Sequence, residues 1–161
     1  IKRGAQQVTQ IDFHFNVPDT LAHVCRLVRK ALEKTPSIVV TGDSVLLTRL
    51  DNMLWDFAPT AFLGHVLLQG ETGSLCGQEL ERARVWLSTS PDHCQRHDLL
   101  INLSDAVAAG FEQYERLIEV VSLDDQDRQR ARDRWRYYAT RGYAISGHAI
   151  GVLKNNISEP G

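Results

Sequence analysis

Hydrophobic and polar positions follow two different periods along the first sixty residues. Residues 11–16 (IDFHFN) alternate apolar and polar side chains, which is the period of a half-buried strand. Residues 37–41 (SIVVT) form a β-branched run that is typical of a strand buried on both faces. Apolar side chains recur every three or four residues over 21–32 and again over 46–57, as in amphipathic helices. This order of strands and helices predicts a parallel sheet with right-handed crossovers.

Helix-capping residues stand at the ends of these predicted helices. Asp19 and Thr20 follow Pro18 where the first helix should begin, and Thr35-Pro36 should stop it. The tight turn at residues 42–44 (GDS) offers N-cap side chains to the second helix. These signals place the helix boundaries independently of the apolar period.

The second half of the chain continues the same alternation of strands and helices. Strands are predicted over 84–87, 98–103 and 116–121, and residues 58–68 form either a short strand or an extended surface segment. A short helix is expected after Ser104-Asp105, and loops over 69–78 and 88–96. A long helix should cover 128–138, with Asp124 and Asp125 favouring its N-terminus and Gly142 as its C-cap. We therefore predict a single α/β domain over residues 8–146, with an arm over 1–7 and an aperiodic tail over 147–161.

Composition limits the class of protein. A chain of 161 residues with 43% hydrophobic residues can bury one sizeable core. No apolar run approaches the roughly 20 residues that span a bilayer, and no secretory signal is visible. The three cysteines are odd in number and unpatterned, which favours a reducing compartment. We expect a cytoplasmic protein without a membrane partner.

Positive charge is concentrated in one predicted helix. Residues 128–136 hold five arginines and one aspartate, a local charge of +4, whereas the whole chain carries -2, so the remainder sums to about -6. A mildly acidic body with one basic helix is not typical of a general nucleic-acid binder and indicates a local anion site. Direct binding of single-stranded DNA by this helix is kept as an alternative.

Helical geometry separates the side chains of this segment into two stripes. At about 100° per residue, three residues share an apolar stripe: Ala131, Trp135 and Tyr138. Three arginines share the neighbouring stripe: Arg128, Arg132 and Arg136. An indole beside guanidinium groups suits a partner that offers an apolar side chain together with negative charge. The alternative is a solvated arginine face on a helix that the apolar stripe docks to the sheet.

The motifs of nucleotide sites, metal sites and catalytic nucleophiles are incomplete or missing in this sequence. The turn at Gly42 lies where a nucleotide-binding fold places its phosphate loop, but it has neither the dinucleotide fingerprint nor a P-loop lysine. Asp92, His93, Cys94 and His97 group possible metal ligands in a spacing that matches no common zinc pattern. We therefore expect no cofactor, no metal and no catalytic residue. A nucleotide-binding enzyme of unknown reaction remains the alternative.

Several short segments follow one another in a characteristic order: 11–15 (IDFHF), 39–43 (VVTGD), 50–55 (LDNMLW), 62–65 (FLGH), 98–102 (DLLIN), 131–138 (ARDRWRYY) and 142–143 (GY). Together they resemble the chi subunit of the bacterial DNA polymerase III holoenzyme, a clamp-loader accessory protein. The resemblance implies a Rossmann-like, mostly parallel sheet flanked by helices and without a nucleotide site. It also implies a non-catalytic adaptor that links the psi subunit of the clamp loader to the acidic C-terminal tail of single-stranded DNA-binding protein, with DNA contacted only indirectly.

The resemblance also assigns two sets of binding residues. The site for the tail, which ends in Pro-Phe, would use Arg132, Trp135 and Arg136, with Val121 as part of its wall; Arg128 extends it by helical geometry only. Trp135 stands where the family often has tyrosine, and Arg136 where lysine can occur. The psi face, which binds an accessory helicase in some relatives, would use a second set: Trp55, Phe62, Leu63 and Gly64. From the residues alone, Trp55 is either a core residue or an exposed anchor.

Overall fold

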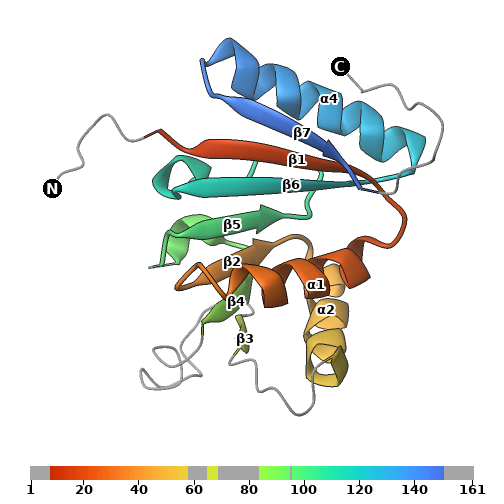
Figure 1. The fold of residues 1–161 in the computed structure, drawn as a ribbon, viewed down its shortest axis with the longest axis vertical. Coiled ribbons are helices and arrows are strands. Elements are labelled where there is room, and N and C mark those ends of the chain that lie inside the picture. The colour runs from red at the N-terminus through yellow and green to blue at the C-terminus, as the bar shows by residue number, and fades with distance from the viewer. Residues whose placement is uncertain (1–7, 58–64, 69–83, 95, 151–161) are drawn as a thin grey trace, which may run out of the picture.

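The computed structural model describes residues 8–57, 65–68, 84–94 and 96–150. Within these residues, seven strands form one sheet in the order β3-β4-β2-β5-β6-β1-β7, and every pairing is parallel (Figure 1). The strands are β1 (Gln10–Val17), β2 (Ile38–Thr41), β3 (His65–Leu68), β4 (Val85–Ser88), β5 (Leu99–Asn102), β6 (Arg116–Ser122) and β7 (Ile145–Ala149). The predicted Rossmann-like sheet is thus confirmed, and the segment 65–68 is a strand.

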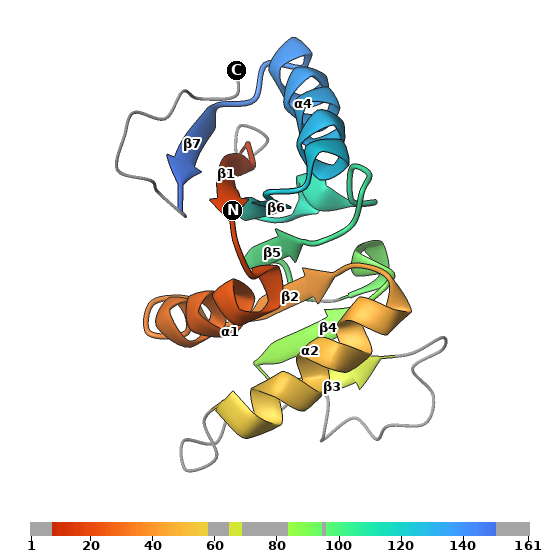
Figure 2. The ribbon, with the colours of Figure 1, turned by 90° about the vertical axis from the view of Figure 1, so that its right-hand side faces the viewer.

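Helices cover both faces of this sheet (Figure 2). Helices α1 (Thr20–Ala31) and α2 (Ser44–Phe57) lie on one face, and α4 (Asp125–Thr140) lies on the other, over the end formed by β6, β1 and β7. The strand residues alternate between two cores accordingly: Phe13 and Leu117 pack on the α4 side, whereas Ile118 and Val120 pack on the α1 side. Helix α4 is therefore positioned at one end of the sheet and α2 at the other.

The predicted capping residues hold the helix ends. The side chains of Asp19, Asp43 and Asp124 each accept a hydrogen bond from a backbone N–H of the first turn of α1, α2 and α4, at 3.1, 2.9 and 3.0 Å. Gly142 adopts a φ of +86° just after α4, and the Tyr143 N–H bonds back to the Tyr138 carbonyl. A left-handed residue at this position favours glycine and ends the helix, as predicted.

Two predicted segments differ from the structure. Residues 147–149 belong to β7 rather than to an aperiodic tail; most of their side chains are exposed, so no burial period marks the strand. The helix expected after Ser104-Asp105 is replaced by bends and a 3₁₀ turn, η4 (Phe111–Gln113). The Asn102 side chain accepts from the Ser104 N–H at 2.9 Å, and such local bonds compete with helix formation. The predicted arm over 1–7 lies outside the described residues.

Three histidines meet on one face of the sheet: His14 of β1, His23 of α1 and His148 of β7. His14 Nδ1 lies 3.0 Å from His23 Nε2 of α1, and His148 of β7 is the register partner of His14. The buried Asp12 carboxylate lies 2.8 Å from Arg116 and 3.6 Å from His148. Burial, followed by the neighbouring His23 and His148, lowers the pKa of His14 from 6.5 to about 4. His14 is thus neutral near pH 7 and can share a hydrogen bond with His23.

We expect stability to fall as the pH drops from about 6.5 to about 4. Over this range the unfolded chain protonates His14 and the folded chain does not, so the unfolded state binds more protons. After allowance for partial exposure the loss should be roughly 1–2 kcal/mol. Urea unfolding of the wild type and His14→Gln across this range tests it. The difference between the two proteins isolates His14 from other titrating groups, and parallel pH profiles would contradict the prediction.

Candidate functional site

The apolar stripe of α4 docks the helix on the sheet. Ala131 and Tyr138 are buried, and Trp135 is half-buried with its ring centroid 4.9 Å from that of Phe13. Tyr138 also contacts Phe13, with the ring centroids 6.0 Å apart. The predicted stripe is therefore confirmed, and Trp135 lies at its border rather than in its interior.

Trp135 reaches from α4 over strand β7. A Cβ atom on Gly147 would lie 3.1 Å from the Phe15 ring and 3.5 Å from the Trp135 ring. A Cβ there would be tight against the Phe15 ring and in ordinary contact with the Trp135 ring, so this glycine permits the close packing of β7 beneath the indole. The contact shows which flank of α4 borders β7: the flank that carries Trp135.

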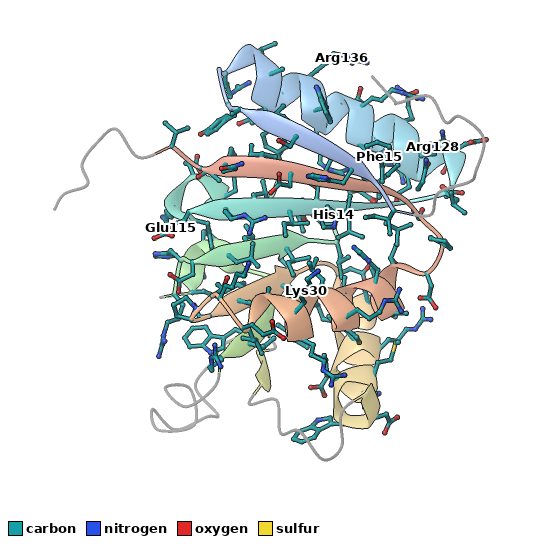
Figure 3. All side chains as sticks on the ribbon, in the orientation of Figure 1. His14, Phe15, Lys30, Glu115, Arg128 and Arg136 are labelled. Carbon is teal, nitrogen blue, oxygen red and sulfur yellow. The ribbon has the colours of Figure 1, made fainter. Side chains whose placement is uncertain are left out.

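The arginines predicted as one basic stripe lie on that same flank. We call Arg128, Arg132 and Arg136 the basic flank; Figure 3 labels Arg128 and Arg136, which lie along α4. Arg132 and Arg136 are exposed and Arg128 is half-exposed. Their partners within the helix are weak and exposed: Asp125 lies 4.0 Å from Arg128, Gln129 lies 3.3 Å from Arg132, and Asp133 lies 3.1 Å from Arg136. Guanidinium donors thus remain accessible to a ligand on this side.

The opposite flank of α4 is occupied by contacts within the protein. Arg130 lies 3.7 Å from Asp105, and the Arg141 guanidinium stacks 3.6 Å from the centroid of the Tyr137 ring. The five arginines of residues 128–136 are therefore not equivalent. Three lie on the flank that carries Trp135, one faces Asp105, and the fifth, Arg134, is buried.

Arg134 joins a buried polar network that the sequence reasoning missed. Its side chain is 3% exposed, and its Nε donates to Glu119 Oε1 at 2.9 Å, the Glu119 side chain being fully buried. The Tyr138 hydroxyl and the Asn102 amide also donate to Glu119, and Arg134 Nη1 donates to the Asp105 carbonyl. Burial raises the pKa of Glu119, and the adjacent Arg134 opposes that rise. A signal was available: an isolated glutamate inside the apolar run 117–121 needs a buried partner.

The remaining predicted tail-site residue, Val121, is 1% exposed and lies in the core that α4 covers. On the opposite face of the sheet, Trp55 of α2 is 55% exposed, so it is not a core residue, and its role as an anchor stays a prediction. Phe62, Leu63 and Gly64 lie outside the described residues. Figure 1 places α2 and α4 toward opposite ends of the sheet.

The two other candidate sites are the turn at Gly42 and the group around Cys94, and both lie in structural contacts. A Cβ on Gly42 would lie 3.1 Å from the Leu103 Cβ, and Asp43 places a carboxylate at the start of α2 where a phosphate would bind. Cys94 is buried, and His97 Nε2 lies 2.9 Å from the Cys94 carbonyl. In the part of the chain that the structure describes, no three side chains are arranged to hold a metal ion. Among the same residues, no helix has the length and apolar character needed to cross a membrane.

The all-parallel sheet with helices on both faces defines a Rossmann-like α/β protein. Within that class, the chain belongs to the family described as "DNA polymerase III chi subunit, HolC", whose model matches residues 8–146. It is 29% identical over 149 residues to the DNA polymerase III subunit chi of Pseudomonas aeruginosa, covering 89% of this chain and 98% of that protein. It is 25% identical over 128 residues to the subunit of the same name from Haemophilus influenzae, covering 79% of this chain and 85% of that protein.

We predict that the buried Glu119–Arg134 pair holds α4 in place. Arg134→Met or Glu119→Gln should each lower the free energy of unfolding by about 3–5 kcal/mol, because each leaves a buried partner uncompensated. The double change Glu119→Leu with Arg134→Met removes both charges and should be less destabilising than the sum of the single changes. Urea unfolding provides the measurement.

Arg130→Met is the matched control, since it removes an exposed arginine from the same helix. We expect it to change the unfolding free energy by less than about 1 kcal/mol. Equal effects of Arg130→Met and Arg134→Met would contradict a special role for the buried pair.

Proposed function

We propose that this protein is a non-catalytic adaptor of the bacterial replication machinery. In this proposal it links the psi subunit of the clamp loader, bound at the α2 end, to the acidic C-terminal tail of single-stranded DNA-binding protein, bound at α4. Family membership supports the replication role, and the observation that carries the tail site is the basic flank beside a half-exposed Trp135. The working compartment is then the bacterial cytoplasm.

The chemistry of the α4 surface matches such a tail. A terminal phenylalanine would pack against Trp135, and its carboxylate would bind Arg132 or Arg136 through charge-assisted hydrogen bonds. Upstream aspartates would lie toward Arg128 and steer the encounter. A short peptide buries little area, so the affinity should be on the order of micromolar. Several tails on one oligomeric partner would raise the effective strength without new contacts.

A peptide ligand fits the local charges better than a nucleic acid does. Arg128 and Arg136 have acidic neighbours on the same helix, Asp125 and Asp133, which reduce the long-range field of the basic flank. A nucleic-acid backbone requires an extended positive surface, whereas a single carboxylate requires two or three well-placed donors. DNA is therefore contacted through the tail-bearing partner.

The separation of the two surfaces supports a bridging role. Helix α2, which carries Trp55, and helix α4, which carries Trp135, lie toward opposite ends of the sheet and on opposite faces of it (Figures 1 and 2). A partner bound to one helix would therefore leave the other helix accessible. An exposed tryptophan is a frequent anchor of protein interfaces. An accessory helicase that binds chi at the α2 surface would compete with psi and not with the tail.

We predict that the basic flank determines binding of the tail. Arg132→Ala and Arg136→Ala should each weaken an acidic peptide ending in Asp-Ile-Pro-Phe by about five- to tenfold, the worth of one exposed charge-assisted contact. Raising the salt concentration should weaken the wild type, because exposed charges are screened over about 10 Å at 0.1 M. Isothermal titration calorimetry at two salt concentrations measures both effects.

The control for this titration is Arg130→Ala, which removes the same charge from the opposite flank of α4. We expect it to change peptide affinity less than about twofold, because Arg130 faces Asp105. Wild-type affinity in the Arg132→Ala, Arg136→Ala double variant would refute the site. Equal losses from Arg130→Ala and Arg132→Ala would indicate net charge rather than a specific contact.

We predict that Trp55→Ala disrupts binding of the psi subunit and leaves tail binding unchanged. Loss of a tryptophan anchor typically weakens the binding free energy by about 2 kcal/mol or more, which is roughly thirtyfold in affinity. Val45→Ala is the matched control, since Val45 is also exposed on α2, near the opposite end of the helix. Co-purification with psi and calorimetry with the tail peptide distinguish the two surfaces. A loss of both activities in Trp55→Ala would point to misfolding and would be checked by its melting temperature.

A further inference from the structure

Strand β7 lies at an edge of the sheet and adjoins the basic flank. It is the last strand in the order, after β1, and residues 146–149 are exposed. A strand at the edge of a sheet presents one row of backbone N–H and C=O groups to which another chain can add. The edge therefore offers hydrogen bonds in addition to the side chains of α4.

The register identifies which backbone groups face away from β1. The Ala144 carbonyl accepts from the Ile11 N–H at 3.2 Å, and the Ile150 N–H donates to the Phe15 carbonyl at 2.9 Å. Both residues thus turn their backbone groups toward β1, and by the period of two this also holds for residues 146 and 148. The backbone groups of the alternate residues point outward: Ile145, Gly147 and Ala149.

The outward-facing row lies beside the charged surface already described. Gly147 sits beneath the Trp135 ring, so the middle of the row adjoins the flank of α4 that carries the arginines. A strand added to β7 would place alternate side chains on the α4 side of the sheet, next to Trp135 and the basic flank. Carboxylates at these positions would meet guanidinium groups, whereas lysines or arginines would be repelled.

We propose that the acidic tail peptide binds in an extended form, as an eighth strand paired with β7. This inference rests on the proposed function and adds the backbone geometry to it. Main-chain hydrogen bonds to Ile145, Gly147 and Ala149 hold the peptide, and the basic flank selects its acidic side chains. Pairing of this kind explains how a peptide with few large side chains binds specifically to the edge of a sheet.

Peptides methylated at single backbone nitrogens test this pairing without altering the protein. In an added strand only every second amide faces β7, so methylation should weaken binding at alternate positions and have little effect between them. The expected loss at a sensitive position is roughly two- to tenfold, the worth of one net hydrogen bond. A loss that does not alternate along the peptide would overturn the edge pairing.

A substitution in β7 provides an independent test. Ala149→Pro removes an outward N–H and leaves the bonds to β1 in place, as prolines in edge strands do. It should weaken the unmodified peptide roughly two- to tenfold, whereas the matched control Ala149→Ser, which keeps the N–H, should bind as the wild type. Equal affinities for both variants, with unchanged melting temperatures, would contradict the proposal.

Hydrogen exchange separates failure of the pairing from failure of the proposed function. Binding of the peptide should slow exchange of the amides of Ile145, Gly147 and Ala149 and change those of Ser146 and His148 much less. If the unmodified peptide does not bind, the tail site itself is wrong and the edge pairing falls with it. If it binds in a manner that depends on Arg132 but protects no β7 amide, the tail site stands and the pairing is wrong.

Discussion

The ion pair between Glu119 and Arg134 is the interaction on which the arrangement of this protein depends. It lies between β6 and α4 with almost no solvent exposure, and the tyrosine and asparagine that also bond to Glu119 come from α4 and β5. Because an unpaired buried charge is costly, α4 is held in the rotation that brings both Arg134 and Tyr138 onto Glu119. That rotation turns Trp135 toward β7 and leaves the neighbouring arginines exposed. A structural network therefore decides where the proposed binding surface lies.

Some charged residues of α4 stabilise the fold and others are exposed to solvent. The position of each residue around the helix decides which of the two it does. Asp124 caps its N-terminus, Arg134 is buried beneath it, and Arg130 faces a loop. The arginines of the basic flank keep weak partners within the helix, which order their side chains without consuming all their donors. Such a surface is suited to a carboxylate that arrives with an apolar group.

The sheet order separates the two surfaces assigned to partners. Helices α1 and α2 lie on one face, while α4 covers the other face at the β6–β1–β7 end, so the proposed tail site and the proposed psi site do not overlap (Figure 2). Among the described strands, β7 forms the edge of the sheet next to the basic flank. This layout is compatible with the proposed adaptor, which would hold two partners at once.

From the amino-acid sequence alone we could derive most strands, the capped helix ends, and the two stripes of α4, because periodicity and capping are local properties. Sequence reasoning missed strand β7, since its exposed side chains leave no period and its place depends on pairing with distant β1. It also treated Arg134 as one more surface arginine, because only the tertiary structure brings Glu119 within 2.9 Å of it. Long-range packing thus decided which arginines remain exposed and which one is buried. Their presence on one helix was already evident from the sequence.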